Sequence, residues 1–266
     1  NMGYLTKRSP IAVLWKSLNR KIFREASFIV VLGRDVQKVV RNRMPLNQRH
    51  KVVYIPNWAD PSLIRPLEFA QNPFVKQLGL ENKFIVQYSG NMGLTHDMET
   101  IIDAARELQN DRTIHFLLIG GGGKLSKIKE MARSYKLHNV TLLPYQPREN
   151  LRNSLSAAHV SLISLEKGAE GLSVPSKLYG ILASRRPAIA IMAKDSEVAI
   201  TLKEFRCGLV TPPKDVAELV KAITWLKSNE CERKAMGERG YKAFLENFTV
   251  QRCAEQYYHL MKQMAH

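Results

Sequence analysis

Short apolar runs alternate with amphipathic stretches through most of the 266-residue chain. From residue 83 the runs are rich in Val, Ile and Leu, which predicts buried strands, and the stretches between them have helical spacing. The strands are expected at 83–90, 113–120, 139–143, 159–165, 186–192 and 208–211, and the helices at 96–109, 124–136, 147–156, 176–184 and 196–204, with three more helices at the end. Strands alternating with helices predict a doubly wound, Rossmann-like α/β domain at 74–245, with ligands at the carboxyl ends of its strands.

The residues before this domain also suggest β-α-β structure. Ser9 before Pro10 predicts a capped helix to about Glu25, and strands at 27–33 and 51–56 flank a helix at 35–43. Two strands cannot close a doubly wound sheet, so residues 1–56 are expected to be the end of an incomplete amino-terminal domain. The proline-rich segment 57–73 predicts an interdomain linker, and 246–266 a separate closing helix.

Composition narrows the class of protein. A hydrophobic content of 45% suits a globular protein, and neither a membrane-spanning run nor a signal peptide is evident. The three cysteines have no paired or metal-ligand spacing, which favours a reducing compartment, and we assign them no function. We therefore expect a cytoplasmic protein.

The net charge of +16 is concentrated near the amino end. Residues 1–51 contain twelve Lys or Arg and two acids, a net charge of +10. Such a basic region implies an anionic partner, unless it is only a solvated surface. Apolar residues at helical spacing between the basic ones, Trp15, Leu18, Ile22 and Phe23, favour an anionic membrane surface over nucleic acid, although they could equally belong to a core.

Glycine-rich loops follow the first two strands of the main domain. The loop SGNMG at 89–93 could bring backbone amides close to a phosphate, although any strand-to-helix turn favours glycine. The run GGGG at 120–123 lacks the spacing of a dinucleotide fingerprint and the Ser or Thr of a phosphate loop, so a flexible turn is an equal alternative.

Two further loops carry polar groups. In LLPYQPREN, at 142–150, prolines on both sides of Gln146 could leave its backbone amide and carbonyl facing a flat base, unless this is a plain turn. In EGLSVPSK, at 170–177, a carboxylate, bare backbone and a lysine precede a helix start, where anions are favoured. A capped helix with a surface glutamate is the alternative reading of this second loop.

Together the loops suit a sugar joined to a diphosphate, because a carboxylate can bind hydroxyls while amides and a lysine bind phosphates. A serine-hydrolase elbow is disfavoured, since Pro175 stands where that turn needs glycine. The sequence also has no Asp-x-Asp pair suited to a metal-held diphosphate. His115 and His159 begin apolar strands and are expected to be structural.

Five ordered motifs resemble the family 4 retaining glycosyltransferases of the GT-B fold, and above all their bacterial exopolysaccharide and lipopolysaccharide branch. The motifs are VVYIPNWADP, YSGNMG, FLLIGGGG, the segment 139–165 and EGLSVPSKLYGILASRRPAIAI. The resemblance implies two Rossmann-like domains, with a nucleotide-sugar donor on the second and a lipid-linked or polysaccharide acceptor on the first. It implies that residues 246–266 cross back to the first domain, and that the chain binds donor but is inactive alone.

The resemblance also implies site residues and partners. The donor is expected to be a UDP-sugar, bound without a metal or other cofactor, and the protein is expected at the inner face of the plasma membrane, without nucleic acid. Glu170 and Lys177 are expected to be catalytic. The expected donor-binding residues are Gly90, Asn91, Gly93, His96, Gly120, Gly121, Tyr145, Gln146, Gly171, Leu172, Ser173, Val174, Ser176 and Leu178.

Two departures from the family pattern leave alternatives open. The second of the family's two glutamates falls on Gly180, and the family's Arg and Lys for the diphosphate fall on Asn91 and His96, so Lys177 is expected to supply the missing cation. A UDP-sugar epimerase of the same fold and a non-catalytic nucleotide-sugar-binding subunit remain alternatives.

Overall fold

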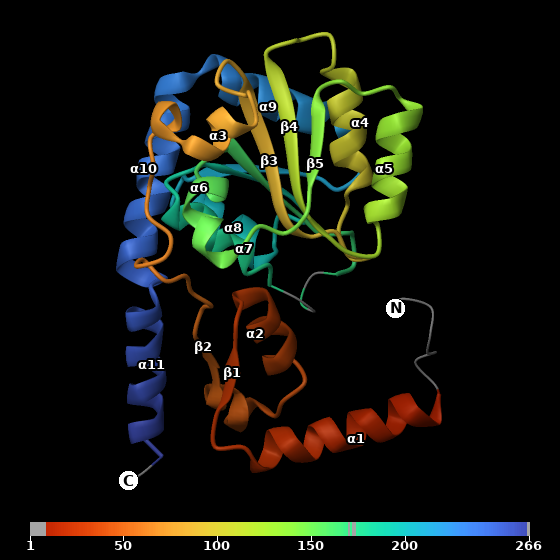
Figure 1. Cartoon of the computed structure of the whole chain (residues 1–266). Helices are drawn as coiled ribbons and strands as arrows, with labels where there is room; N and C mark the ends of the chain where they lie inside the picture. Colours follow the sequence, from red (N-terminus) through yellow and green to blue (C-terminus); the bar gives the residue numbers. More distant parts are fainter. Residues whose placement is uncertain (1–8, 170, 172–173, 265–266) are drawn as a thin grey trace.

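The computed structural model describes residues 9–169, 171 and 174–264. Figure 1 shows a small unit, at the bottom of the view, below a larger unit built around a six-stranded sheet. The last two helices run along one side of the molecule and pass both units.

The small unit contains a two-stranded parallel sheet. Helix α1 (Pro10–Glu25) begins as expected, with the Ser9 hydroxyl accepting a hydrogen bond from the amide of Ala12 at 3.2 Å. The other elements are β1 (Ile29–Val31), α2 (Arg34–Arg41), a 3₁₀ turn (Leu46–Lys51) and β2 (Val52–Tyr54). The expected strand at 51–56 is shorter at both ends, because the 3₁₀ turn takes its first residue and β2 ends at Tyr54.

The large sheet is entirely parallel, with the strand order β5-β4-β3-β6-β7-β8. Its strands are β3 (Phe84–Asn91), β4 (Ile114–Gly121), β5 (Val140–Leu143), β6 (Val160–Ser164), β7 (Ala188–Ile191) and β8 (Gly208–Thr211). All six expected strands are present. The order reverses direction between β3 and β6, the position at which doubly wound sheets bind ligands.

Helices cover both faces of the sheet. One apolar cluster joins it to α4 (Glu99–Glu107), α5 (Leu125–Ser134) and α9 (Val216–Ser228). On the other face lie α3 (Pro73–Gln77), α6 (Leu151–Leu155), α7 (Lys177–Ala183), α8 (Glu197–Glu204) and α10 (Glu230–Asn247). The expected helix at 147–156 is divided into a 3₁₀ turn (Arg148–Asn150) and α6. These layers confirm the expected Rossmann-like fold.

Alternation within the strands explains the two layers. On β3, Val86 and Tyr88 point to the α4 side, whereas Ile85 points to the α3 and α6 side, and all three are completely buried. A strand with both faces buried loses its polar alternation, which is why these segments are continuous apolar runs in the sequence.

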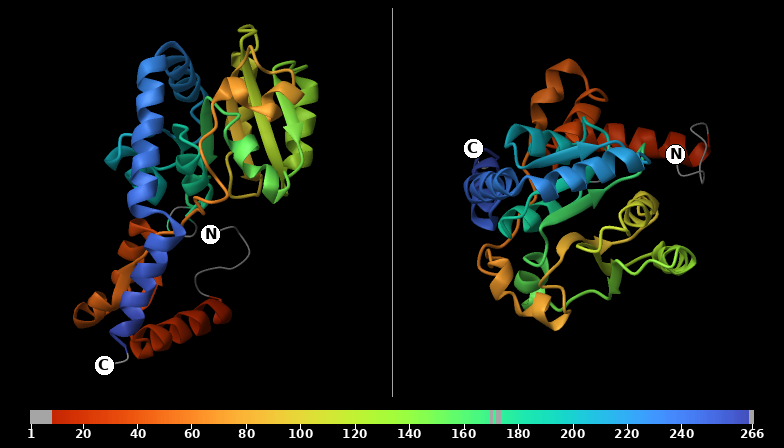
Figure 2. Two further views of the ribbon diagram at one scale, coloured as in Figure 1. Left: turned by 60° about the vertical axis from the view of Figure 1, so that its left-hand side comes forward. Right: turned by 90° about the horizontal axis from the view of Figure 1, so that it is seen from above.

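The linker and the carboxy-terminal helices meet at one point. The amide of Ala59 donates to the carbonyl of Phe248 at 3.1 Å, and the amide of Val250 donates to the carbonyl of Ala59 at 3.2 Å. Helix α10 ends at Asn247 and α11 (Val250–Lys262) begins after the Thr249 cap, so the helical break lies two residues beyond the expected boundary at 245. Figure 1 and the left view of Figure 2 show α11 beside the small unit. Among the described helices, none has the length and apolar character needed to cross a membrane.

Candidate functional site

The carboxyl ends of β3 and β4 bring the first two glycine-rich loops together. Gly90 pairs with Gly120 and Asn91 with Gly121 in the parallel register. A Cβ atom on Gly120 would overlap the carbonyl oxygen of Gly90, and the φ angle of Gly120 is +134°. This close approach requires glycine at position 120 and brings the two loops together at one edge of the sheet.

Lys177 reaches this edge from the first turn of α7. Its Nζ lies 3.6 Å from the centroid of the Tyr88 ring, and a Cβ on Gly90 would lie 3.2 Å from the same nitrogen. Tyr88 is held in turn by a 2.6 Å hydrogen bond from its hydroxyl to the carbonyl of Asn91. In the described part of the chain, the buried Nζ of Lys177 has no hydrogen-bond partner. The structure therefore brings to the predicted phosphate loops a buried ammonium group that contacts the Tyr88 ring but has no hydrogen-bond partner among the described residues.

Burial controls the charges around this ammonium. It lowers the pKa of Lys177 to about 7. Burial first, and then the positive charge of Lys177, lowers the pKa of His96 to about 4, so this imidazole is neutral near pH 7. His96 is therefore not a cation near pH 7, and Lys177 is the lysine whose ammonium lies beside these loops.

Tyr145 and Gln146 lie after β5, where the sequence predicts contacts with a base. The Tyr145 hydroxyl donates to the carbonyl of Gly121 at 3.2 Å, while the side chain is 58% exposed. The side-chain amide of Gln146 donates within the loop, from Nε2 to the carbonyl of Pro144 at 3.0 Å. An exposed aromatic ring is thus fixed beside the glycine-rich loops.

We define the donor loop as residues 170–176. Three of its predicted site residues, Glu170, Leu172 and Ser173, lie outside the described residues. Gly171 has a φ of +71°, Val174 is partly buried, and Ser176 is exposed without a side-chain capping bond to α7.

Leu178 has a different place from the predicted one. Its side chain is completely buried in the core beneath α7, and its amide donates to the carbonyl of Pro175 at 3.4 Å. The structure therefore assigns Leu178 to packing rather than to a donor contact, because an inward-facing residue of α7 points away from the strand ends.

Gly180 also belongs to packing in this structure. A Cβ at this position would lie 3.3 Å from Leu155 and 3.5 Å from Ile64, both apolar. A side chain at position 180 would therefore start toward these two residues, which lie at packing distance from the helix.

Lys124 forms an ion-pair network that sequence reasoning missed. Its Nζ donates to Glu99 at 2.7 Å, to Glu166 at 2.8 Å and to the carbonyl of His96 at 2.7 Å. Glu99, Glu166 and Asp97 have carboxylate oxygens close enough together to suggest a metal site. The ammonium of Lys124 already binds two of the three, so the cluster links the loops after β3, β4 and β6 through a lysine.

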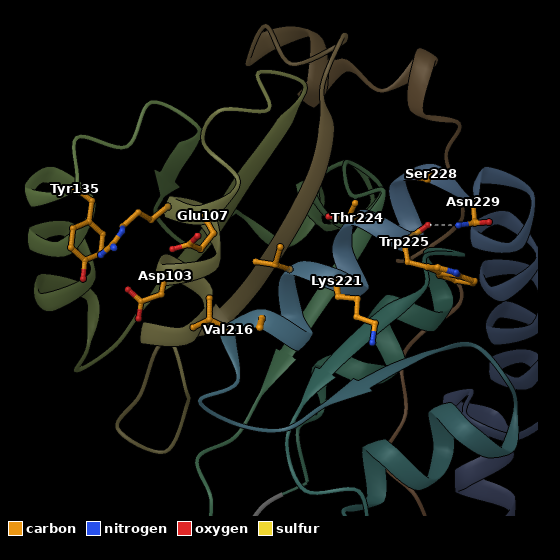
Figure 3. A pocket seen from close by; sticks show the side chains of 12 residues that line it. Asp103, Glu107, Tyr135, Val216, Lys221, Thr224, Trp225, Ser228 and Asn229 are labelled. Atoms are coloured by element: carbon orange, nitrogen blue, oxygen red, sulfur yellow. Dashed lines mark hydrogen bonds between the residues drawn. The ribbon is translucent and has the colours of Figure 1, made fainter.

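A groove of about 1060 Å³ lies elsewhere, on the outer surface of α4, α9 and the end of α5 (Figure 3). Tyr135, Val216, Lys221 and Trp225 are among the residues that line it. None of the predicted site residues contributes to this lining, so the groove is separate from the strand-end site.

Comparison with known proteins defines the family. Residues 71–243 match the family model described as "Glycosyl transferases group 1", and the chain belongs to this family. The match covers the six-stranded sheet and the loops described above.

The relatives are bacterial. "Probable glycosyltransferase WbjE" of Pseudomonas aeruginosa is 29% identical over 83% of this chain and 54% of its own length. WcaI of Escherichia coli strain K12, named for colanic acid biosynthesis, is 30% identical over 65% of this chain and 43% of its own length. The chain thus spans about half the length of these relatives. Anabaena HepE in complex with UDP has the same fold, with a TM-score of 0.83 at 14% identity over 96% of this chain and 70% of that protein.

Proposed function

We propose that this chain is the donor-binding part of a retaining glycosyltransferase that moves a sugar from a UDP-sugar to a lipid-linked or polysaccharide acceptor in bacterial exopolysaccharide or cell-envelope synthesis. In this proposal, residues 1–56 are the end of the acceptor domain, 57–73 the linker, 74–245 the donor domain and 246–266 the helical segment that crosses back. The amino-terminal remainder of the enzyme supplies most of the acceptor site.

The observation that carries the proposal is the buried ammonium of Lys177 beside Gly90, which has no hydrogen-bond partner within the described residues. Burying a cation without a partner is costly, and an anionic ligand at the strand ends would remove that cost. The loops at 89–93 and 120–123 offer backbone amides on the same edge, as a diphosphate requires. Family membership and a structural relative in complex with UDP support a nucleotide sugar over other anions.

The proposed mechanism uses these groups on the leaving side of the reaction. As the glycosidic bond breaks, negative charge grows on the diphosphate, and Lys177 with the amides of Gly93 and Gly171 stabilises it there. Glu170 binds sugar hydroxyls, and the acceptor attacks from the face that the diphosphate leaves. The proposal requires no metal, since the ammonium provides the compensating charge.

A calorimetric panel tests the proposal on residues 1–266. We expect saturable binding of UDP and UDP-sugars, with unchanged affinity when magnesium is replaced by a chelator, and much weaker binding of GDP and ADP. Absence of binding to every nucleotide would overturn the donor-site assignment, and a strict requirement for magnesium would overturn its metal-free form.

Donor binding should depend on pH through Lys177. In the free protein this ammonium loses its proton near pH 7, whereas a bound diphosphate favours the charged form and raises its pKa. Binding therefore takes up a proton above pH 7, and UDP-sugar affinity should fall as the pH rises from about 7 to 9. Calorimetry at pH 8 in buffers of different ionisation enthalpy measures this uptake. An uptake of zero protons, or an uptake that persists in Lys177→Met, would contradict the role of this lysine.

The acceptor side is proposed to lie at an anionic membrane surface on the cytoplasmic face. The exposed apolar face of α1 consists of Ile11, Leu14, Trp15, Leu18 and Ile22, with exposed fractions from 46% to 71%. Exposed basic residues flank it: Lys16, Arg20, Lys21 and Arg24. A helix with this pattern can bury its apolar face among headgroups while its cations bind acidic lipid.

Vesicle sedimentation tests the membrane proposal on the full-length enzyme. We expect strong binding to vesicles with acidic phospholipid and weak binding to neutral ones, and we expect Leu14→Ser/Trp15→Ser to lower binding at least tenfold. Trp225→Ser, at a 41% exposed tryptophan of α9, is the matched control and should bind as the unmodified enzyme does. Equal binding to both lipids would contradict the preference for an anionic surface, and an unaffected double variant would show that the apolar face of α1 does not bind the membrane.

A further inference from the structure

A buried carboxylate joins the small unit to the donor domain. Glu197 stands in the first turn of α8, and its side chain is 1% exposed. It accepts hydrogen bonds from the backbone amide of Arg34 at 2.5 Å, from Arg34 Nη2 at 2.9 Å and from the Tyr54 hydroxyl at 2.8 Å. All three donors come from the small unit, at the start of α2 and the end of β2.

The charge of Glu197 is compensated within this contact. Arg34 Nε lies 3.1 Å from the same carboxylate, and the Thr201 hydroxyl donates to it at 3.2 Å. A second carboxylate, Glu204, binds Arg34 from the outer side and is 47% exposed. Since buried charges depend on their partners far more than exposed ones, Glu197 and not Glu204 fixes the guanidinium.

Close to the contact between Arg34 and Glu197, α2 also lies against the donor loop. Gly33 immediately precedes Arg34, and a Cβ on it would lie 2.7 Å from a methyl group of Val174 and 3.0 Å from the Cβ of Glu197. A Cβ on Gly171 would lie 3.3 Å from a methyl group of Val39, on α2. Helix α2 and the glycine before it therefore contact Gly171 and Val174 of the donor loop, and Glu197 binds the first residue of this helix.

We propose that Glu197, with Arg34 and Tyr54, is a positioning residue that holds Gly171 and Val174 in place for donor binding by fixing α2 against them. The inference rests on the proposed function, because it assigns the role to a loop that binds the sugar diphosphate. It adds that the donor site depends on the small unit as well as on the Rossmann-like sheet. The base is bound elsewhere, near Tyr145, and its binding is independent of this contact.

Paired titrations with a UDP-sugar and with UMP test the inference. Glu197→Gln keeps the shape of the side chain but removes its charge, so Arg34 is held less firmly. We expect the dissociation constant of the UDP-sugar to rise about tenfold, equivalent to about 1.4 kcal/mol, while that of UMP changes less than twofold. Glu204→Gln, which alters the outer partner of the same arginine, should leave both constants unchanged.

A second variant adds a methyl group between the start of α2 and Val174. This methyl group also lies close to Asp35 and Glu197, so recovery on adding Val174→Ala identifies the part of the effect that acts through the loop. Gly33→Ala places a methyl group against Val174 and should weaken UDP-sugar binding as Glu197→Gln does, and adding Val174→Ala should restore part of the affinity. UDP-sugar affinity unchanged in both Glu197→Gln and Gly33→Ala, or an equal loss for UMP and the UDP-sugar, would overturn the inference. If the unmodified chain binds neither UMP nor the UDP-sugar, the proposed function itself fails. This outcome differs from failure of the positioning role, in which the unmodified chain binds both ligands and the variants bind them equally well.

Discussion

Replacing Lys177 by methionine is expected to lower the turnover number of the full-length enzyme about 100- to 1000-fold, a loss of about 2.7–4 kcal/mol of transition-state stabilisation. The reason is the position of its Nζ, which is buried, unpaired within the described residues and adjacent to Gly90. Charge on the diphosphate is greater in the transition state than in the bound donor, so donor affinity should fall much less than turnover. Steady-state kinetics together with calorimetric donor binding separate the two effects.

The control for this variant is Lys129→Met, at an exposed position of α5 in the same domain. It removes one positive charge without reaching the strand ends and should retain normal turnover. Methionine at position 177 also removes a poorly solvated ammonium, so the midpoint of thermal unfolding should not decrease. Turnover that stays within threefold of the unmodified enzyme would exclude Lys177 from catalysis.

Local pattern was sufficient to predict the fold. Strands such as β3 and β4 are buried on both faces, so their sequences are continuous apolar runs that contrast with the amphipathic helices between them. The errors lie at ends and breaks, as at 147–156, where one expected helix is a 3₁₀ turn followed by α6. The helical break at Phe248 depends on pairing with Ala59, a distant contact that no local pattern reveals.

The candidate site was predictable only in part. Glycines after strands and Lys177 at a helix start have recognisable local signals, and the structure brings them to one edge. Which cation remains free depends on pairing between loops: Lys124 is used by Glu99 and Glu166, whereas Lys177 is not paired within the described residues. The contact of Arg34 with Glu197 spans 163 positions, and the sequence contains many other basic and acidic residues that could have paired instead.

Among glycine-to-alanine substitutions at the candidate site, Gly120→Ala is expected to lower the free energy of unfolding the most. The added Cβ would overlap the carbonyl oxygen of Gly90, which is backbone and cannot change rotamer to avoid it. The φ of +134° adds a conformational cost of about 1–3 kcal/mol for a residue with a side chain. Relief requires the paired ends of β3 and β4 to separate, which would also displace the amides of both phosphate loops.

Substitutions at two other glycines separate the conformational cost from the steric cost. Gly79 has a φ of +63° with nothing within 4 Å of an added Cβ, so Gly79→Ala carries a conformational cost of about 1–2 kcal/mol without a steric one. Gly123→Ala meets only Leu94, at 3.7 Å, without a positive φ, and should be nearly neutral. Thermal unfolding and UDP-sugar titration of the three variants should rank Gly120→Ala well below Gly79→Ala in stability, with donor affinity lost in Gly120→Ala alone. If Gly120→Ala were no less stable than Gly79→Ala and bound donor normally, β3 and β4 would have room to separate, and the close approach of the two loops would not be a requirement of the donor site.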